Sequence, residues 1–119
     1  MSIHEWDNKW HRLGFLSKVD RSELRGWVGL YKAVLNNQIM YVGRAVEYNN
    51  GGLAKRLADY IRESDSGRKH QSGQLMHNNA EHLVIYVLKV GNDSEAAQKT
   101  KELEHEFIEY YNPPWNVMP

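Results

Sequence analysis

Hydrophobic and polar positions follow two different periods along this chain, and the periods predict its helices and strands. Near the start, apolar side chains recur at spacings of three and four residues, at Ile3, Trp6, Trp10 and Leu13. This spacing places them on one face of a helix, so we expect an amphipathic helix that ends near Gly14. Its two tryptophans are expected to pack against the rest of the protein.

Three later segments are rich in aromatic and β-branched residues, which are typical of strands. Residues 27–35 and 38–43 flank Asn36-Asn37, a dipeptide that favours a tight turn. This arrangement predicts an antiparallel hairpin. The apolar run from Leu83 to Val90 predicts a third, buried strand.

Helical periodicity returns twice after the hairpin. Leu53 to Glu63 follows a flexible Asn-Asn-Gly-Gly sequence, and a long helix is predicted from Glu95 to Tyr111, stopped by Pro113-Pro114. The order of elements indicates an α+β domain with a small three-stranded sheet, antiparallel or mixed, flanked by helices. We expect residues 1–26 to be an N-terminal helical extension of a domain that spans residues 27–119.

Composition adds limits to this outline. The chain has 119 residues, of which 41% are hydrophobic and 25% charged, enough for one core and one domain. Fifteen basic residues balance fifteen acidic ones, so any site for a polyanion must be local. Without cysteine the chain has no disulfide and no thiolate metal site. No apolar run approaches membrane-spanning length, and we expect a soluble, cytoplasmic protein.

The hairpin carries the first chemical signal. Gly29-Leu30-Tyr31 in one strand and Tyr41-Val42-Gly43 in the other each place a phenol near a glycine. Glycine lets backbone approach a ligand closely, and paired hydroxyls suit phosphate chemistry.

The strand register decides whether the two phenols can share a site. A regular two-residue turn would put Tyr31 opposite Val42, with Tyr41 on the other face of the sheet. A shared site therefore requires a loop of odd length or a β-bulge between the two tyrosines.

Glu104 is the carboxylate that breaks the pattern of the last helix. At about 100° per residue, Glu104 falls on the apolar face, whereas the other charged side chains of this helix fall on the polar face. An unpaired buried carboxylate would cost on the order of several kcal/mol, so Glu104 should meet a cation, a metal ion or a wet cleft. A structural ion pair with an arginine is the alternative.

Arg56 and Tyr60 stand one turn apart at the edge of the apolar face of the 53–63 helix. Together they could present a guanidinium and a phenol to one anion. The alternative is a surface ion pair between Arg56 and Asp59, with Tyr60 packed at the margin of the core.

Taken together, these segments resemble the GIY-YIG nuclease superfamily over about residues 27–117. The two triplets match its two signature triplets, with leucine in place of isoleucine in the first, and the order and spacing of the later segments also match. Tyr60 and Arg44 make the chain most similar to the N-terminal nuclease domain of the bacterial excision-repair endonuclease. The residues that match the motifs of the superfamily are Tyr31, Tyr41, Arg56, Glu104 and Asn116.

The resemblance implies an endonuclease that hydrolyses DNA phosphodiester bonds and leaves 5′-phosphate and 3′-hydroxyl ends. Glu104 would hold a single Mg²⁺ or Mn²⁺ ion, and Arg56, helped by Tyr60, would bind the scissile phosphate. Tyr31 is the favoured proton acceptor, while Tyr41 and Asn116 would position water, phosphate or neighbouring side chains.

Gly43 and Arg44 complete the expected site as substrate-binding residues, and Arg44 would also favour a phenolate. Two alternatives to a self-sufficient nuclease remain. One is a catalytically silent interaction module for nucleic acid or protein. The other is a nuclease that depends on a homodimer or a protein partner for its substrate, because a neutral chain offers few phosphate contacts outside the site.

Overall fold

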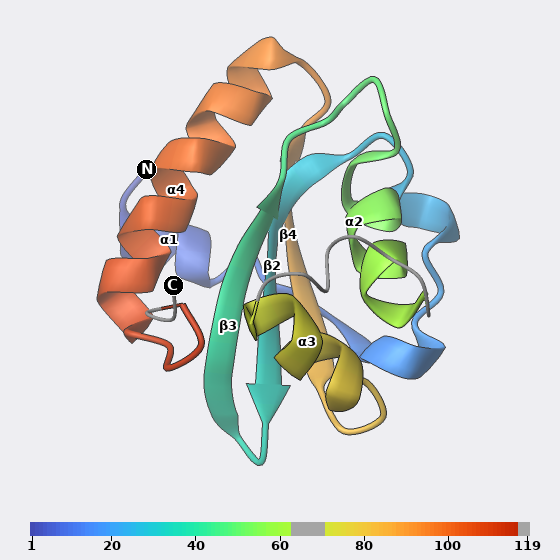
Figure 1. Cartoon of the computed structure of the whole chain (residues 1–119). Coiled ribbons are helices and arrows are strands. Elements are labelled where there is room, and N and C mark those ends of the chain that lie inside the picture. Colours follow the sequence, from blue (N-terminus) through green and yellow to red (C-terminus); the bar gives the residue numbers. More distant parts are fainter. Residues whose placement is uncertain (63–70, 117–119) are drawn as a thin grey trace.

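A four-stranded antiparallel sheet with helices on both faces forms the centre of the molecule (Figure 1). The structure, a computed structural model, describes residues 1–62 and 71–116. The strands are β1 (His11–Phe15), β2 (Val28–Leu35), β3 (Gln38–Ala45) and β4 (Val84–Gly91), in the spatial order β1-β4-β2-β3. The expected α+β class is confirmed, with one more strand than the sequence indicated.

The additional strand comes from the N-terminal segment. Helix α1 spans only Ile3–Asp7, closed at its start by a capping box between Ser2 and Glu5, and β1 follows it and pairs with β4. The prediction of one helix to Gly14 is therefore wrong. Gly14 has a φ of 122°, at an irregularity of the β1–β4 pairing, and this conformation is foreign to a helix. The free edge of β4 offers a pairing partner that local periodicity does not reveal.

The hairpin of β2 and β3 combines a tight turn with a bulge. Asn36 and Asn37 have φ values of 51° and 66°, as a two-residue turn between twisted strands requires. Val34 pairs with Ile39, but the next pair is Ala33 with Tyr41, so one extra residue is accommodated in β3. The shift places Tyr41 on the same face of the sheet as Tyr31, and the expected bulge is confirmed.

Helices cover the two faces of the sheet unequally. On one face lie α2 (Gly52–Ile61), α3 (Gln71–Asn78) and two short 3₁₀ turns, η1 (Leu16–Lys18) and η2 (Ser22–Leu24); on the other lie α1 and α4 (Ser94–Tyr111) (Figure 1). Asp93 caps α4 by accepting a hydrogen bond of 2.9 Å from the backbone N–H of Ala96. The predicted helix to Glu63 ends earlier, at Ile61, and Glu63 lies outside the described residues.

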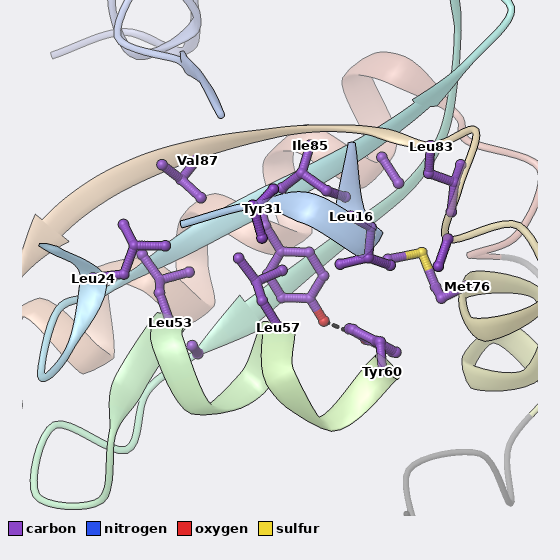
Figure 2. Packing of buried hydrophobic residues seen from close by; sticks show 14 of the residues in the cluster. Leu16, Leu24, Tyr31, Leu53, Leu57, Tyr60, Met76, Leu83, Ile85 and Val87 are labelled. Carbon is purple, nitrogen blue, oxygen red and sulfur yellow. Dashed lines mark hydrogen bonds between the residues drawn. The ribbon is translucent and has the colours of Figure 1, made fainter. Parts of the chain in front are cut away.

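Alternate residues of β2 enter two separate cores. Leu30 packs with Val42, Leu88, Leu103 and Phe107 beneath α4, whereas Tyr31 packs beneath α2 and α3 (Figure 2). Each fully buried aliphatic side chain stabilises the fold by about 1.5–3 kcal/mol. No helix in residues 1–62 and 71–116 combines the length and the apolar character needed to cross a bilayer.

Candidate active site

Three tyrosines from three elements converge on the α2 face of the sheet. The hydroxyl of Tyr31, from β2, forms a short hydrogen bond with the hydroxyl of Tyr60, from α2 (Figure 2). The ring centroids of Tyr31 and Tyr41 are 6.3 Å apart, and those of Tyr31 and Tyr60 are 5.8 Å apart. The structure thus brings together the phenols that the sequence placed on separate segments.

The glycines of both triplets are in close contact with other atoms of the protein, so that a Cβ atom would not fit at either position. A Cβ atom on Gly29 would lie 2.0 Å from the carbonyl oxygen of Leu88 in the neighbouring strand. A Cβ atom on Gly43 would lie 2.3 Å from the hydroxyl oxygen of Tyr31, which pairs with Gly43 across the hairpin. In this structure the space above Gly43 is filled by the Tyr31 phenol.

Burial raises the pKa of all three phenols above the ordinary value for tyrosine. Tyr31 is only 1% exposed, and burial together with the neighbouring tyrosines raises its pKa well above 10. Burial also raises the pKa of Tyr60. Tyr41 is partly exposed; burial raises its pKa and so does Glu104, while hydrogen bonding to Ser72 and the charge of Arg56 oppose the rise.

Arg56 is held by a glutamate that the sequence analysis did not single out. Its Nη2 donates a hydrogen bond of 2.5 Å to Oε1 of Glu47, which follows β3. Burial alone would raise the pKa of Glu47, but the charge of Arg56 and backbone N–H donors lower it below its usual value. The alternative partner, Asp59, pairs instead with Lys55 at 3.3 Å and with Arg62 at 3.4 Å.

Glu104 lies where the helical periodicity of α4 places it. Its side chain is 19% exposed, whereas the other glutamates of α4 are exposed. Its Oε1 accepts a hydrogen bond of 3.1 Å from Nη1 of Arg44. Burial raises the pKa of Glu104, and the charges of Arg44 and Arg56 oppose the rise. Glu104 therefore has an arginine partner, and both side chains of this ion pair are partly accessible to solvent.

Glu104 and Tyr41 affect each other electrostatically, although the helix that carries Glu104 and the tyrosine cluster lie on opposite faces of the sheet. Besides burial, the charge of Glu104 adds to the rise in the pKa of Tyr41, and the charge of Arg56 opposes the rise in the pKa of Glu104. These effects act around β3, which is an edge strand. The charges of Arg56 on α2 and Glu104 on α4 thus reach Tyr41 on β3 at this edge.

Asn116 covers the free edge of β3, and both the oxygen and the nitrogen of its side-chain amide form hydrogen bonds there. Its Oδ1 accepts a hydrogen bond of 2.8 Å from the backbone N–H of Val42, and its Nδ2 donates one of 2.8 Å to the carbonyl oxygen of Val42. The backbone N–H of Trp115 likewise donates to the carbonyl oxygen of Met40 at 2.9 Å. Asn116 therefore supports the middle of the second triplet from outside the sheet.

The donor set fits an ion that keeps much of its water. Within residues 1–62 and 71–116, no group of three or more histidines, aspartates and glutamates is arranged to hold a metal ion. Mg²⁺ commonly binds through one or two carboxylates, several waters and substrate phosphate oxygens. A half-buried Glu104, whose pKa is raised by burial, gains from a cation and fits this mode of binding.

Other members of the site carry no sequence motif. Ser72 hydrogen-bonds the phenol of Tyr41, and Nδ1 of His77 lies 2.7 Å from the carbonyl oxygen of Tyr60. Both come from α3. Their position beside the tyrosines depends on how α3 packs against α2, a contact that no local spacing encodes.

Comparison with solved structures identifies the fold. The magnesium-bound GIY-YIG N-terminal endonuclease domain of UvrC from Thermotoga maritima is similar to this chain with a TM-score of 0.56 and 20% identity, over 78% of this chain and 86% of that chain. A point variant of that domain, bound to its catalytic divalent cation, gives a TM-score of 0.56 and 19% identity over the same shares.

Comparisons by sequence, in contrast, give no match. No protein-family model matches the chain, and curated proteins give no significant match. At this level of identity, the structural similarity shows that the chain shares the GIY-YIG nuclease fold, as the motifs had indicated.

Proposed function

We propose that this protein is a divalent-metal-dependent endonuclease that hydrolyses DNA phosphodiester bonds and leaves 5′-phosphate and 3′-hydroxyl ends. One observation carries the proposal. The phenols of Tyr31, Tyr41 and Tyr60, the guanidinium of Arg56 and the half-buried carboxylate of Glu104 influence one another around the edge strand of a nuclease-type fold. A purely structural core would not require this set of polar groups at its rim.

Arg56 is proposed to bind the non-bridging oxygens of the scissile phosphate. Glu47 accepts from its Nη2 and thereby orients the guanidinium, while the remaining N–H donors can face a phosphate. Charge grows on those oxygens as the nucleophile attacks, so a fixed guanidinium stabilises the transition state more than the ground state. Loss of one such group typically costs about 10²–10³ in rate.

Tyr41 is the proposed proton acceptor, in place of Tyr31. Water cannot reach the Tyr31 hydroxyl in this conformation, since the side chain is 1% exposed. Tyr41 is more accessible, and although burial raises its pKa, the charge of Arg56 opposes that rise. Glu104 raises that pKa, so a cation bound at Glu104 would remove an obstacle to the phenolate. Tyr31 then acts as a positioning residue through its hydrogen bond to Tyr60.

Glu104 is the proposed ligand of a single Mg²⁺ or Mn²⁺ ion. A bound divalent ion would supply charge neutralisation at the phosphate. Arg44 opposes the rise in the pKa of Glu104 and so favours its ionised form, and the exposed guanidinium can turn to the substrate when the carboxylate takes a cation. Asn116 is proposed to act through Val42, by holding the second triplet in place.

DNA is the proposed substrate, in the cytoplasm, and a second copy of the chain or a protein partner would add substrate specificity. The neutral net charge favours such help, because intrinsic affinity for a polyanion depends on the number of phosphate contacts.

The test is incubation of the purified protein with end-labelled duplex, nicked, branched and single-stranded DNA, and with matched RNA, in Mg²⁺, in Mn²⁺ and in a chelator. We expect metal-dependent cleavage that Glu104→Ala abolishes. Glu102→Ala, an exposed position on the same helix, is the matched control and should retain activity. A wild-type protein that cuts none of these substrates but binds DNA through the same surface would be the silent interaction module instead.

A further inference from the structure

A second polar feature lies on the opposite side of α2 from the tyrosines. It is a groove of about 770 Å³ between α2 and the segment that includes η2. Its charged lining residues are Arg21, Arg25, Lys55 and Arg62, with Asp20 as the acidic one. Among the described lining residues, four positive charges against one negative give a local excess of three, whereas the whole chain has a net charge of zero.

Backbone hydrogen bonds fix the two walls of this groove to each other. Arg25 forms an isolated β-bridge with Gly52, the first residue of α2. The N–H of Gly26 donates to the carbonyl oxygen of Gly51 at 3.3 Å, and the N–H of Leu53 donates to that of Trp27 at 2.9 Å. The groove is therefore preformed. Ala54 and Ala58 line it on the α2 side, and their small side chains leave it open.

Two of the four cations have no ion-pair partner among the described residues, although the charge of Arg21 does act on Asp20 beside it. Lys55 and Arg62 share one carboxylate, that of Asp59. Arg21 and Arg25 form no ion pair with any residue in the described part of the chain. The carboxylate of Asp20 accepts from the N–H of Ser22 at 2.9 Å, and this contact lowers its pKa. The groove thus presents two unpaired guanidinium groups to solvent, which match phosphate oxygens in geometry.

We propose that this groove binds the sugar–phosphate backbone of the DNA substrate on one side of the scissile bond; the inference rests on the proposed nuclease function. Lys55 and Arg56 are adjacent on α2 and project about 100° apart, so one points toward the groove and the other toward the tyrosines. A helix is about 10–12 Å thick, and a DNA strand advances roughly 3.4 Å per nucleotide. A duplex whose axis runs across α2 would therefore place in the groove phosphates about three nucleotides from the one that Arg56 binds.

The double variant Arg21→Gln/Arg25→Gln tests this surface. Its matched control is Lys99→Gln/Lys101→Gln, which removes the same charge from α4, across the sheet. Binding of labelled duplex DNA is measured by fluorescence anisotropy in a chelator, from 50 to 200 mM salt. Loss of two phosphate contacts should lower the salt slope by about two units, so that this salt increase weakens wild-type binding about tenfold more than binding of the groove variant.

The control should keep the wild-type salt slope. In cleavage assays the groove variant should show a higher KM for DNA with little change in kcat. Equal slopes in wild type and groove variant, or equal losses in groove variant and control, would overturn the proposal. So would a polyglutamate peptide that binds the wild type and not the groove variant while DNA binding is unchanged, because the partner would then be an acidic peptide.

Failure of the groove and failure of the nuclease give different results. A wild type that cuts DNA while the groove variant binds and cuts like it refutes the groove alone. A wild type that cuts nothing, with a salt slope that still falls in the groove variant, refutes the nuclease and retains the groove as a nucleic-acid contact.

Discussion

The α-carbon of Gly43 lies directly against the phenol of Tyr31. A Cβ atom at Gly43 would stand 2.3 Å from both Cζ and the hydroxyl oxygen of Tyr31, the residue opposite it in the hairpin. Tyr31 is fully enclosed beneath α2 and has no room to retreat. The glycine of the second triplet is therefore coupled to the tyrosine of the first, and one packing contact joins the two motifs.

We expect Gly43→Ala to destabilise the protein by about 1–3 kcal/mol through overpacking and to reduce cleavage, since the added methyl group displaces the Tyr31 phenol. Urea unfolding and a cleavage assay measure the two effects. In a Tyr31→Ala background the same glycine change should cost much less, with a coupling energy of about 0.5–3 kcal/mol. An equal cost in both backgrounds would mean that Gly43 is needed for another reason.

Glu104→Gln should separate stability from activity. Burial raises the pKa of Glu104, so its ionised form is destabilising above the ordinary pKa of a glutamate, and at neutral pH the amide should leave the melting temperature unchanged or higher. Cleavage should be lost. Leu103→Ala, a buried neighbour, should instead cost about 2–5 kcal/mol, with activity lost only as the domain unfolds. Equal losses of melting temperature in both variants would identify Glu104 as half of a structural ion pair.

Arg56→Ala should lower the cleavage rate at saturating DNA by at least about a hundredfold. Binding should weaken modestly, with a salt slope smaller by about one unit, because a single phosphate contact is lost. Single-turnover cleavage and anisotropy titrations give the two quantities. Arg62→Ala, at the C-cap of α2, is the comparison, because it also removes one positive charge but lies outside the tyrosine cluster. An unchanged single-turnover rate in Arg56→Ala would remove Arg56 from the catalytic step.

Stability should fall at alkaline pH because of the buried tyrosines. The pKa values of Tyr31 and Tyr60 in the folded state are raised by burial. Their contribution is complete below the unfolded pKa of about 10 and is lost as pH rises beyond it, at about 1.4 kcal/mol per pH unit for each tyrosine. Urea unfolding between pH 9 and 11.5 measures the slope. Tyr31→Phe and Tyr60→Phe should each reduce it, and the exposed Tyr110→Phe should not.

Asn116→Ala should cost about 1–3 kcal/mol, because the N–H and carbonyl groups of Val42 lose their partners. If Asn116 acts only by supporting β3, its kcat should recover at lower temperature as the folded population recovers. A kcat that stays depressed in fully folded protein, checked by circular dichroism, would assign Asn116 a direct contact with the reacting groups.

Much of this fold and site is encoded locally and could be predicted from the sequence. The hairpin follows from β-rich runs around Asn36-Asn37, and the inward position of Glu104 follows from the period of one helix. The need for a bulge between Tyr31 and Tyr41 follows from side-chain alternation together with the expectation that the two phenols share one site. Each of these depends on spacing within one or two neighbouring elements, which a sequence displays directly.

Tertiary structure decided the rest, because it depends on contacts between distant segments. Pairing with β4 turns residues 11–15 into a strand, against their helical spacing. Arg56 forms its ion pair with Glu47 rather than with Asp59, and the side-chain amide of Asn116 hydrogen-bonds the backbone of Val42. The accessibility of each tyrosine, which moves the proposed proton acceptor from Tyr31 to Tyr41, is set by how α2 and α3 close over the sheet. Periodicity shows which face a side chain occupies, but burial and partners arise only when the faces meet.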